Sequence, residues 1–77
     1  MKLEYGQDNT RTVVSYPKTI KDMLHDMNEY TKKLGISYYY RNISLGEKEW
    51  RIDFGSYTKF FFVTDLPENA LAQLHNA

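Results

Sequence analysis

The 77-residue sequence contains no cysteine, which excludes disulfides, cysteine-ligated metal sites and thiol catalysis. It has no apolar run near the roughly 18–20 residues of a membrane-spanning helix, and residues 1–9 lack the apolar stretch of a signal peptide. Neither sign of charge prevails, because ten Lys and Arg balance ten Asp and Glu, unlike the basic profile of a duplex-DNA binder. We therefore expect a cytoplasmic protein that does not act at a membrane.

Glycine and proline are also scarce, with four and two residues that stand singly along the chain. No repeat or linker divides the sequence, so we expect one small domain over residues 1–77. Short strands are predicted over residues 2–5 and 10–16, on either side of a polar turn at residues 6–9. In the second strand Thr12, Val13 and Val14 favour the extended form, because β-branched side chains are stiff at χ1.

A helix is predicted over residues 20–34, where apolar side chains recur at helical spacing. The helix is predicted to open at Pro17 or at Thr19. Proline is tolerated at a first helical position, and Thr19, with Asp22 three residues later, is typical of a helix N-terminus. Gly35 is the expected left-handed residue just past the helix end.

The C-terminal half predicts three strands and a second helix. The strands are expected over residues 36–43, 48–54 and 57–64, with a turn at 44–47 and a two-residue hairpin turn at 55–56. Asp65, with Glu68 three residues later, predicts the start of the last helix. The order (ββ)αβββα predicts an α+β fold, an antiparallel β-meander with helices packed on one face.

The segment 57–64 is apolar on both faces, so the register of its hairpin decides which side chains face away from the first helix. A two-residue turn would leave Phe60 and Phe62 on that outer face, whereas a slide by one residue would leave Tyr57, Phe61 and Val63 there. Hydrophobic pattern usually sets register where one face is buried. The hydrophobic pattern favours the register that slides by one residue, and we expect that register.

In either register, large apolar side chains face away from the first helix. The second helix or the N-terminal hairpin could cover them. If they are exposed, such a patch marks an interaction site in soluble proteins, and aromatic and Arg side chains dominate interface hot spots. We therefore predict a non-enzymatic module that binds another protein through its sheet face. The expected binding residues are Tyr39, Arg41, Arg51, Tyr57, Lys59 and Phe61.

The same features are compatible with a homodimer that uses this sheet face. They also suit a small accessory or inhibitor protein, of which phage-encoded inhibitors of host machinery are one group.

Single-stranded nucleic acid is an alternative partner, because bases stack on aromatic rings while Arg and Lys contact phosphates. The candidates are Tyr38, Tyr39, Tyr40, Arg41, Arg51, Tyr57, Lys59 and Phe61. Glu47, Glu49 and Asp53 lie near these cations in the sequence, which argues against a uniformly positive groove. Protein binding is therefore the favoured prediction.

From Pro17 onward, the αβββα order resembles that of double-stranded-RNA-binding domains. That family carries a basic pair at the start of its last helix, which contacts phosphates. The corresponding stretch here is acidic, Asp65-Leu66-Pro67-Glu68. The resemblance therefore concerns element order, and RNA binding is not carried over.

One polar helix face could in principle hold a divalent ion, since Asp22, His25, Asp26 and Glu29 are spaced to share it. A solvated surface is the simpler interpretation of such a set. No nucleophile–base pattern or glycine-rich phosphate loop is present. We expect no enzymatic activity, no cofactor and no metal.

Overall fold

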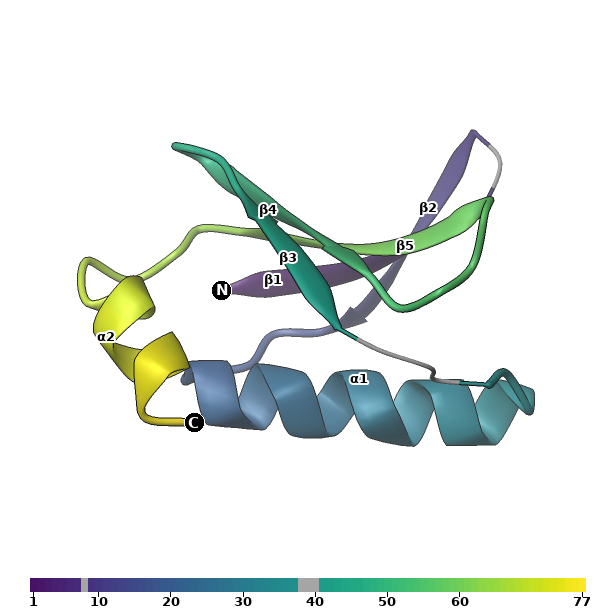
Figure 1. The fold of residues 1–77 in the computed structure, drawn as a ribbon, viewed down its shortest axis with the longest axis horizontal. Coiled ribbons are helices and arrows are strands. Elements are labelled where there is room, and N and C mark those ends of the chain that lie inside the picture. The colour runs from purple at the N-terminus through teal and green to yellow at the C-terminus, as the bar shows by residue number, and fades with distance from the viewer. Residues whose placement is uncertain (8, 38–40) are drawn as a thin grey trace.

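The computed structural model describes residues 1–7, 9–37 and 41–77 of the chain. The elements in these residues are β1 (Lys2–Gln7), β2 (Thr10–Ser15), α1 (Ile20–Leu34), β3 (Asn42–Leu45), β4 (Glu49–Asp53), β5 (Lys59–Thr64) and α2 (Ala70–His75). The strands form an antiparallel sheet in the order β2-β1-β5-β4-β3, and both helices lie on one side of it (Figure 1). The predicted α+β class is confirmed.

Strand β5 is the central strand of the sheet, between β1 and β4. Leu3 and Tyr5 of β1 pair with Val63 and Phe61 of β5. A central strand has neighbours on both edges, and its two faces are more fully packed than those of an edge strand. Its place explains why this segment is apolar on both sides.

The core lies between the sheet and α1. Met23 and Met27 of the helix are fully buried there, as are Ile52, Phe61 and Val63 of the sheet. The buried hydrophobic residues are Leu3, Tyr5, Ile20, Met23, Met27, Trp50, Ile52, Phe54, Phe61, Val63 and Ala70. The layer holds several aromatic rings because a domain this short buries only about 60–65% of its unfolded surface and needs large side chains to do so.

Helix α1 begins after Thr19, the second of its two predicted starts, rather than at Pro17, and it ends as predicted. The Asp22 backbone N–H donates to Thr19 Oγ1 at 3.1 Å, and Gly35 adopts a left-handed φ of 68°. The Ile20 N–H donates to Gln73 Oε1 at 2.8 Å, which joins the first turn of α1 to α2.

The last helix starts later than predicted. Asp65 does not cap it: Asp65 has a positive φ of 55°, and α2 begins at Ala70 with Asn69 in the cap position. An N-cap residue typically has an extended backbone with negative φ, which Asp65 does not have. Asp65 instead turns the chain at the end of β5.

Several strand boundaries also differ from the prediction. β1 runs to Gln7 rather than to residue 5, so the predicted turn at residues 6–9 is shorter, and β5 starts at Lys59 rather than at residue 57. The strand expected over 36–43 starts at Asn42 and runs to Leu45, while Ile36 and Ser37 belong to no strand. Residues 38–40 of that prediction lie outside the described residues. The turn consequently falls at 46–48 rather than at 44–47.

The register of the β4–β5 hairpin matches neither the two-residue turn nor the slide by one residue. Trp50 pairs with Val63 and Ile52 with Phe61, so the expected slide by one residue is wrong. The connection spans residues 54–58 rather than two residues. Phe54 at its start is fully buried, and its ring centroid lies 5.3 Å from that of Phe61.

Candidate functional site

The candidate site is the outer face of the sheet, which we define as the face opposite α1 and α2 (Figure 1). Its residues are those that alternate with the buried ones and pair with one another across the strands. They are Lys2, Glu4, Gly6, Arg11, Val13, Asn42, Ser44, Glu49, Arg51, Asp53, Phe60, Phe62 and Thr64. Neither helix covers this face.

Two phenylalanines of β5 occupy the middle of the outer face. Phe60 and Phe62 are half-buried, and their ring centroids lie 6.5 Å apart. The Arg11 guanidinium lies 3.6 Å from the centroid of Phe62, and that of Arg51 lies 5.1 Å from the centroid of Phe60. Both distances are within the range of a cation–π interaction. Each ring therefore has a guanidinium group near its face.

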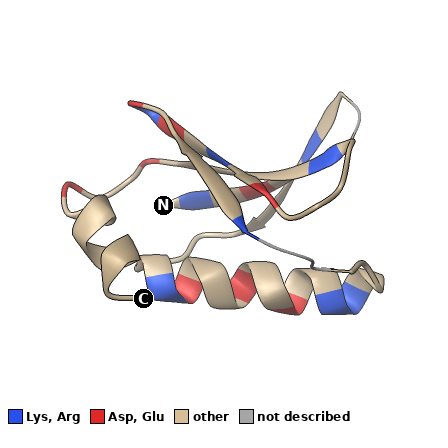
Figure 2. Ribbon diagram, viewed as in Figure 1, with Lys and Arg blue, Asp and Glu red and all other residues tan. Residues whose placement is uncertain are grey.

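Carboxylates hold the Arg11 side chain in place. Arg11 reaches from β2 to β4, where its Nη1 donates to Glu49 Oε1 at 2.5 Å. The same nitrogen lies 3.9 Å from Glu4 Oε1, and Lys2 Nζ lies 3.9 Å from the other oxygen of that carboxylate. Charges of both signs therefore alternate across the sheet (Figure 2).

Gly6 makes room for the Phe62 ring. A Cβ atom at this position would lie 2.5 Å from Phe62 Cε2, closer than a carbon–carbon contact allows. The ring of Phe62 lies over the bare backbone of β1, an arrangement in which an aromatic side chain covers a strand glycine. The conformation of the outer face thus depends on this glycine.

The predicted binding residues do not gather in one place. Arg51 is on the outer face as expected, and Tyr57 is fully exposed in the loop before β5. Arg41 is exposed and precedes β3. Tyr39 lies outside the described residues.

For two further residues, the expected outward orientation is wrong. Phe61 is completely buried, and Lys59 lies on the same side of β5, opposite Gln7. Compared with the pairing that a two-residue turn would give, β5 is shifted by two residues along β4, so Lys59 and Phe61 still face inward. A shift by one residue would have turned both outward. The surplus of apolar side chains on the outer face is confirmed, but Phe60 and Phe62 provide it.

Sequence reasoning missed Arg11 as a member of this face. Arg11 lies far from β4 in the sequence, and only the β1–β5 pairing brings the two strands within reach of one another. A signal was present in Gly6, because a glycine inside a strand often marks the close approach of another group.

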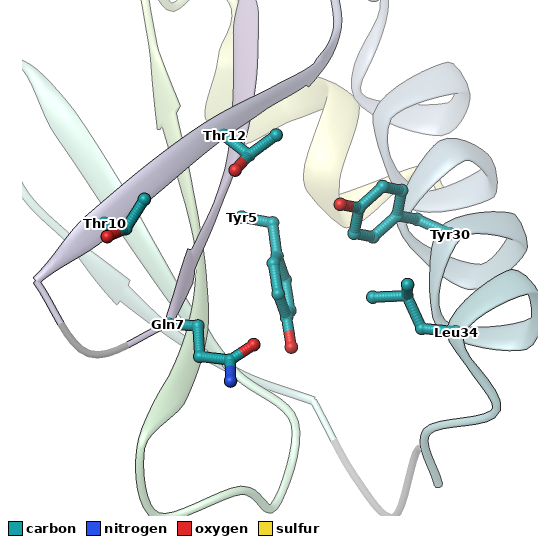
Figure 3. A pocket seen from close by; sticks show the side chains of 6 residues that line it. All are labelled: Tyr5, Gln7, Thr10, Thr12, Tyr30 and Leu34. Atoms are coloured by element: carbon teal, nitrogen blue, oxygen red, sulfur yellow. The ribbon is translucent and has the colours of Figure 1, made fainter.

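A separate hollow of about 350 Å³ lies on the other side of the sheet, between its β2 edge and the C-terminal half of α1. Figure 3 shows Thr10, Thr12 and Gln7 on the sheet side and Tyr30 and Leu34 on the helix side. The Tyr5 ring lies between them, with its hydroxyl pointing toward the end where Gln7 and Leu34 lie.

The Tyr5 hydroxyl is buried and has no hydrogen-bond partner among the described residues. Burial, with a smaller contribution from the neighbouring Tyr30, raises the pKa of this phenol above its usual value of 10.0. A buried donor without a partner destabilises the folded state.

Tyr5→Phe is therefore expected to raise the free energy of unfolding at pH 8 by about 1 kcal/mol. Below pH 10 the phenol is uncharged in both states. Above it, the unfolded chain loses the proton while the folded chain retains it, so stability falls as pH rises. Urea unfolding at pH 8 and pH 11 should show a smaller alkaline loss for Tyr5→Phe than for the wild type.

Tyr16→Phe is the control for this prediction, because Tyr16 is 70% exposed. It should retain the alkaline loss of the wild type. A Tyr5→Phe variant less stable than the wild type at pH 8 would show that the hydroxyl makes a net favourable interaction.

The acidic helix face engages other groups instead of converging on one point. Asp26 accepts a hydrogen bond from Ser15 Oγ at 2.7 Å, and Glu29 lies 3.6 Å from Lys32 Nζ. Over residues 1–7, 9–37 and 41–77, no group of three or more His, Asp or Glu side chains is arranged to hold a metal ion. No helix in the same ranges has the length and apolar character to cross a bilayer.

Comparison of the chain with protein-family models, curated proteins and solved structures finds no match.

Proposed function

We propose that this chain is a non-enzymatic protein-binding module that docks another protein on the outer face of its sheet. The observation that carries the proposal is the uncovered centre of this face, where Phe60 and Phe62 lie beneath Arg51 and Arg11. Aromatic and Arg side chains contribute most to binding energy when they are desolvated near the middle of an interface. The surrounding charges would orient the partner.

The charge pattern favours a protein over single-stranded nucleic acid. A nucleic-acid groove needs free cations along the phosphate path and open ring faces for the bases. Here Glu49 and Glu4 neutralise Arg11, and the Arg11 guanidinium already occupies a face of Phe62. A protein partner can meet alternating charges with complementary ones. A domain of this size would act by covering a functional surface of its partner, as accessory and inhibitor proteins do.

The test uses the double variant Phe60→Ala, Arg51→Ala and a partner captured by the tagged wild-type chain and then purified. We expect the Kd of the double variant for this partner to be at least about 30-fold higher than that of the wild type, because hot-spot truncation costs about 2 kcal/mol or more. The wild-type Kd should change little between 50 and 200 mM salt, whereas a nucleic-acid binder loses affinity steeply.

The matched control is Lys18→Ala, Lys21→Ala, which removes two exposed cations near the start of α1, away from the outer face. It should bind like the wild type. Equal affinity of the Phe60→Ala, Arg51→Ala variant and the wild type would refute docking on this face. A dimer in sedimentation that the same double variant dissociates would assign the face to self-association instead.

A further inference from the structure

The edge of the sheet at β2 is open. β2 is a six-residue edge strand with an irregularity of register at Val14, and its first four residues, which precede that point, are exposed and regularly paired with β1. The opposite edge strand, β3, has four residues. Short edge strands protect a sheet against pairing with other chains, whereas a longer exposed one offers unpaired backbone groups to an added strand.

Two hollows follow one another between β2 and α1. The first, lined by Tyr5, Thr10, Thr12 and other groups, has a volume of about 350 Å³. The second has a volume of about 320 Å³, and Val14 and Ser15 line it on the strand side. Tyr30 lines both hollows and separates them. From the first hollow to the second, the lining residues advance along β2, from Thr10 and Thr12 to Val14 and Ser15. Those of α1 move back toward its N-terminus, so the strand and the helix form the two antiparallel walls of one groove.

The chemistry of the two hollows differs. The first carries no charged side chain among its described lining residues, but it contains the unpartnered Tyr5 hydroxyl, and Tyr5 is only 5% exposed. The second is lined by two carboxylates, Asp26 and Glu29, and by one cation, Lys33. Asp26 accepts one hydrogen bond, from Ser15, and Glu29 has an exposed ion pair with Lys32, so the carboxylates retain acceptor capacity. A polar atom would satisfy the Tyr5 hydroxyl, and a basic side chain would complement the second hollow.

We propose that the groove between β2 and α1 binds an extended peptide segment of another protein, which adds to the sheet as a strand beside β2. Side chains two positions apart in a strand point to the same side and lie about 6.6–6.8 Å apart. One would enter the first hollow and bring a polar end to Tyr5. The next on that side would be Lys or Arg and would enter the second hollow. Backbone hydrogen bonds would supply affinity and the two hollows specificity.

A second copy of this chain fits the groove less well. If β2 paired with β2 of another copy, the side chains directed to the helix side would be those of Thr10 and Thr12, which pair with Gln7 and Tyr5, and, beyond the bulge, that of Ser15. These are short side chains that would leave both hollows largely unfilled, and none is basic. The groove lies on the helix side of the sheet, so this binding is independent of docking on the outer face.

The probe is a displayed library of random heptapeptides, selected against the wild-type chain and counter-selected against Thr12→Trp. Thr12 is exposed and lines the first hollow, so tryptophan there blocks the groove while it keeps a residue favoured in strands. Val13→Trp is the matched control, because Val13 is the next residue of the same strand and belongs to the outer face.

We expect enriched peptides to carry Lys or Arg two positions from a residue with a polar end. A synthetic peptide of this kind should slow amide hydrogen exchange in β2. Its Kd should rise at least tenfold with Thr12→Trp and with Tyr5→Phe, and less than twofold with Val13→Trp. Thermal unfolding of each variant verifies its fold, and Tyr5→Phe preserves the packing of the ring.

Three outcomes would overturn the inference: no sequence enriched by the wild type over Thr12→Trp, enriched peptides that leave β2 exchange unchanged, or equal weakening by Val13→Trp and Thr12→Trp. A concentration-dependent dimer that Thr12→Trp dissociates would assign the groove to a second copy and would also overturn it. None of these results depends on Phe60 or Arg51, so failure here leaves the outer-face proposal standing.

Discussion

Phe61→Ala is expected to lower the free energy of unfolding by about 3–5 kcal/mol. The ring is completely buried and meets Tyr5, Tyr30 and Phe54 at centroid distances of 5.4, 6.2 and 5.3 Å. Removing it leaves a cavity where three other rings converge. A domain of this length has a total stability of about 4–12 kcal/mol, so the loss is a large share of the whole. Urea unfolding followed by far-UV circular dichroism measures it.

Tyr57→Ala is the control for this experiment, because it removes an aromatic side chain that is fully exposed in the same hairpin. Its unfolding midpoint should be close to that of the wild type. If Phe61→Ala kept native stability and lost only a binding partner, the assignment of Phe61 to the core would be wrong.

Gly6→Val is expected to destabilise the fold by about 2 kcal/mol, within the range of overpacked sites. The new side chain must displace the Phe62 ring, because even a Cβ atom would lie 2.5 Å from it. When the ring moves, Arg11 loses its position 3.6 Å from the ring centroid. We therefore expect Gly6→Val also to weaken binding on the outer face, although Gly6 presents no side chain to a partner.

A double-mutant cycle separates this clash from other effects of the glycine replacement. Phe62→Ala removes the obstructing ring, so the cost of Gly6→Val should be much smaller in that background than in the wild type. Chemical denaturation of the four proteins supplies the cycle. Additive costs would mean that Gly6 and Phe62 do not interact, contrary to the arrangement in the structure.

The helix α1 could be predicted almost in full because its determinants are local. Thr19 and Gly35 define its ends through hydrogen bonds and backbone conformation within a few residues. The buried positions Met23 and Met27 follow from helical periodicity alone. The start of α2 was misplaced because a capping pattern at Asp65 was present in the sequence, whereas the backbone there turns with a positive φ.

For the candidate site, the sequence predicted an excess of aromatic side chains on the sheet but not which of them face outward. An excess of aromatic side chains on the sheet follows from counting them in one segment, and Phe60 and Phe62 confirm it on the outer face. Which rings face outward depended on the length of the loop before β5. The pairing of Trp50 with Val63 and of Ile52 with Phe61 fixes that length, and it depends on contacts across the sheet that no turn preference encodes.

Sequence alone determined the α+β class, the position and ends of α1, and the presence of more ring-bearing side chains than one layer can bury. These properties follow from short-range periodicity and composition. The tertiary structure decided that β1 joins β5, that Arg11 thereby reaches Phe62 and Glu49, and that Phe61 belongs to the core. Such pairings join residues far apart in the chain, and packing in three dimensions selects among registers that local preferences leave nearly equal.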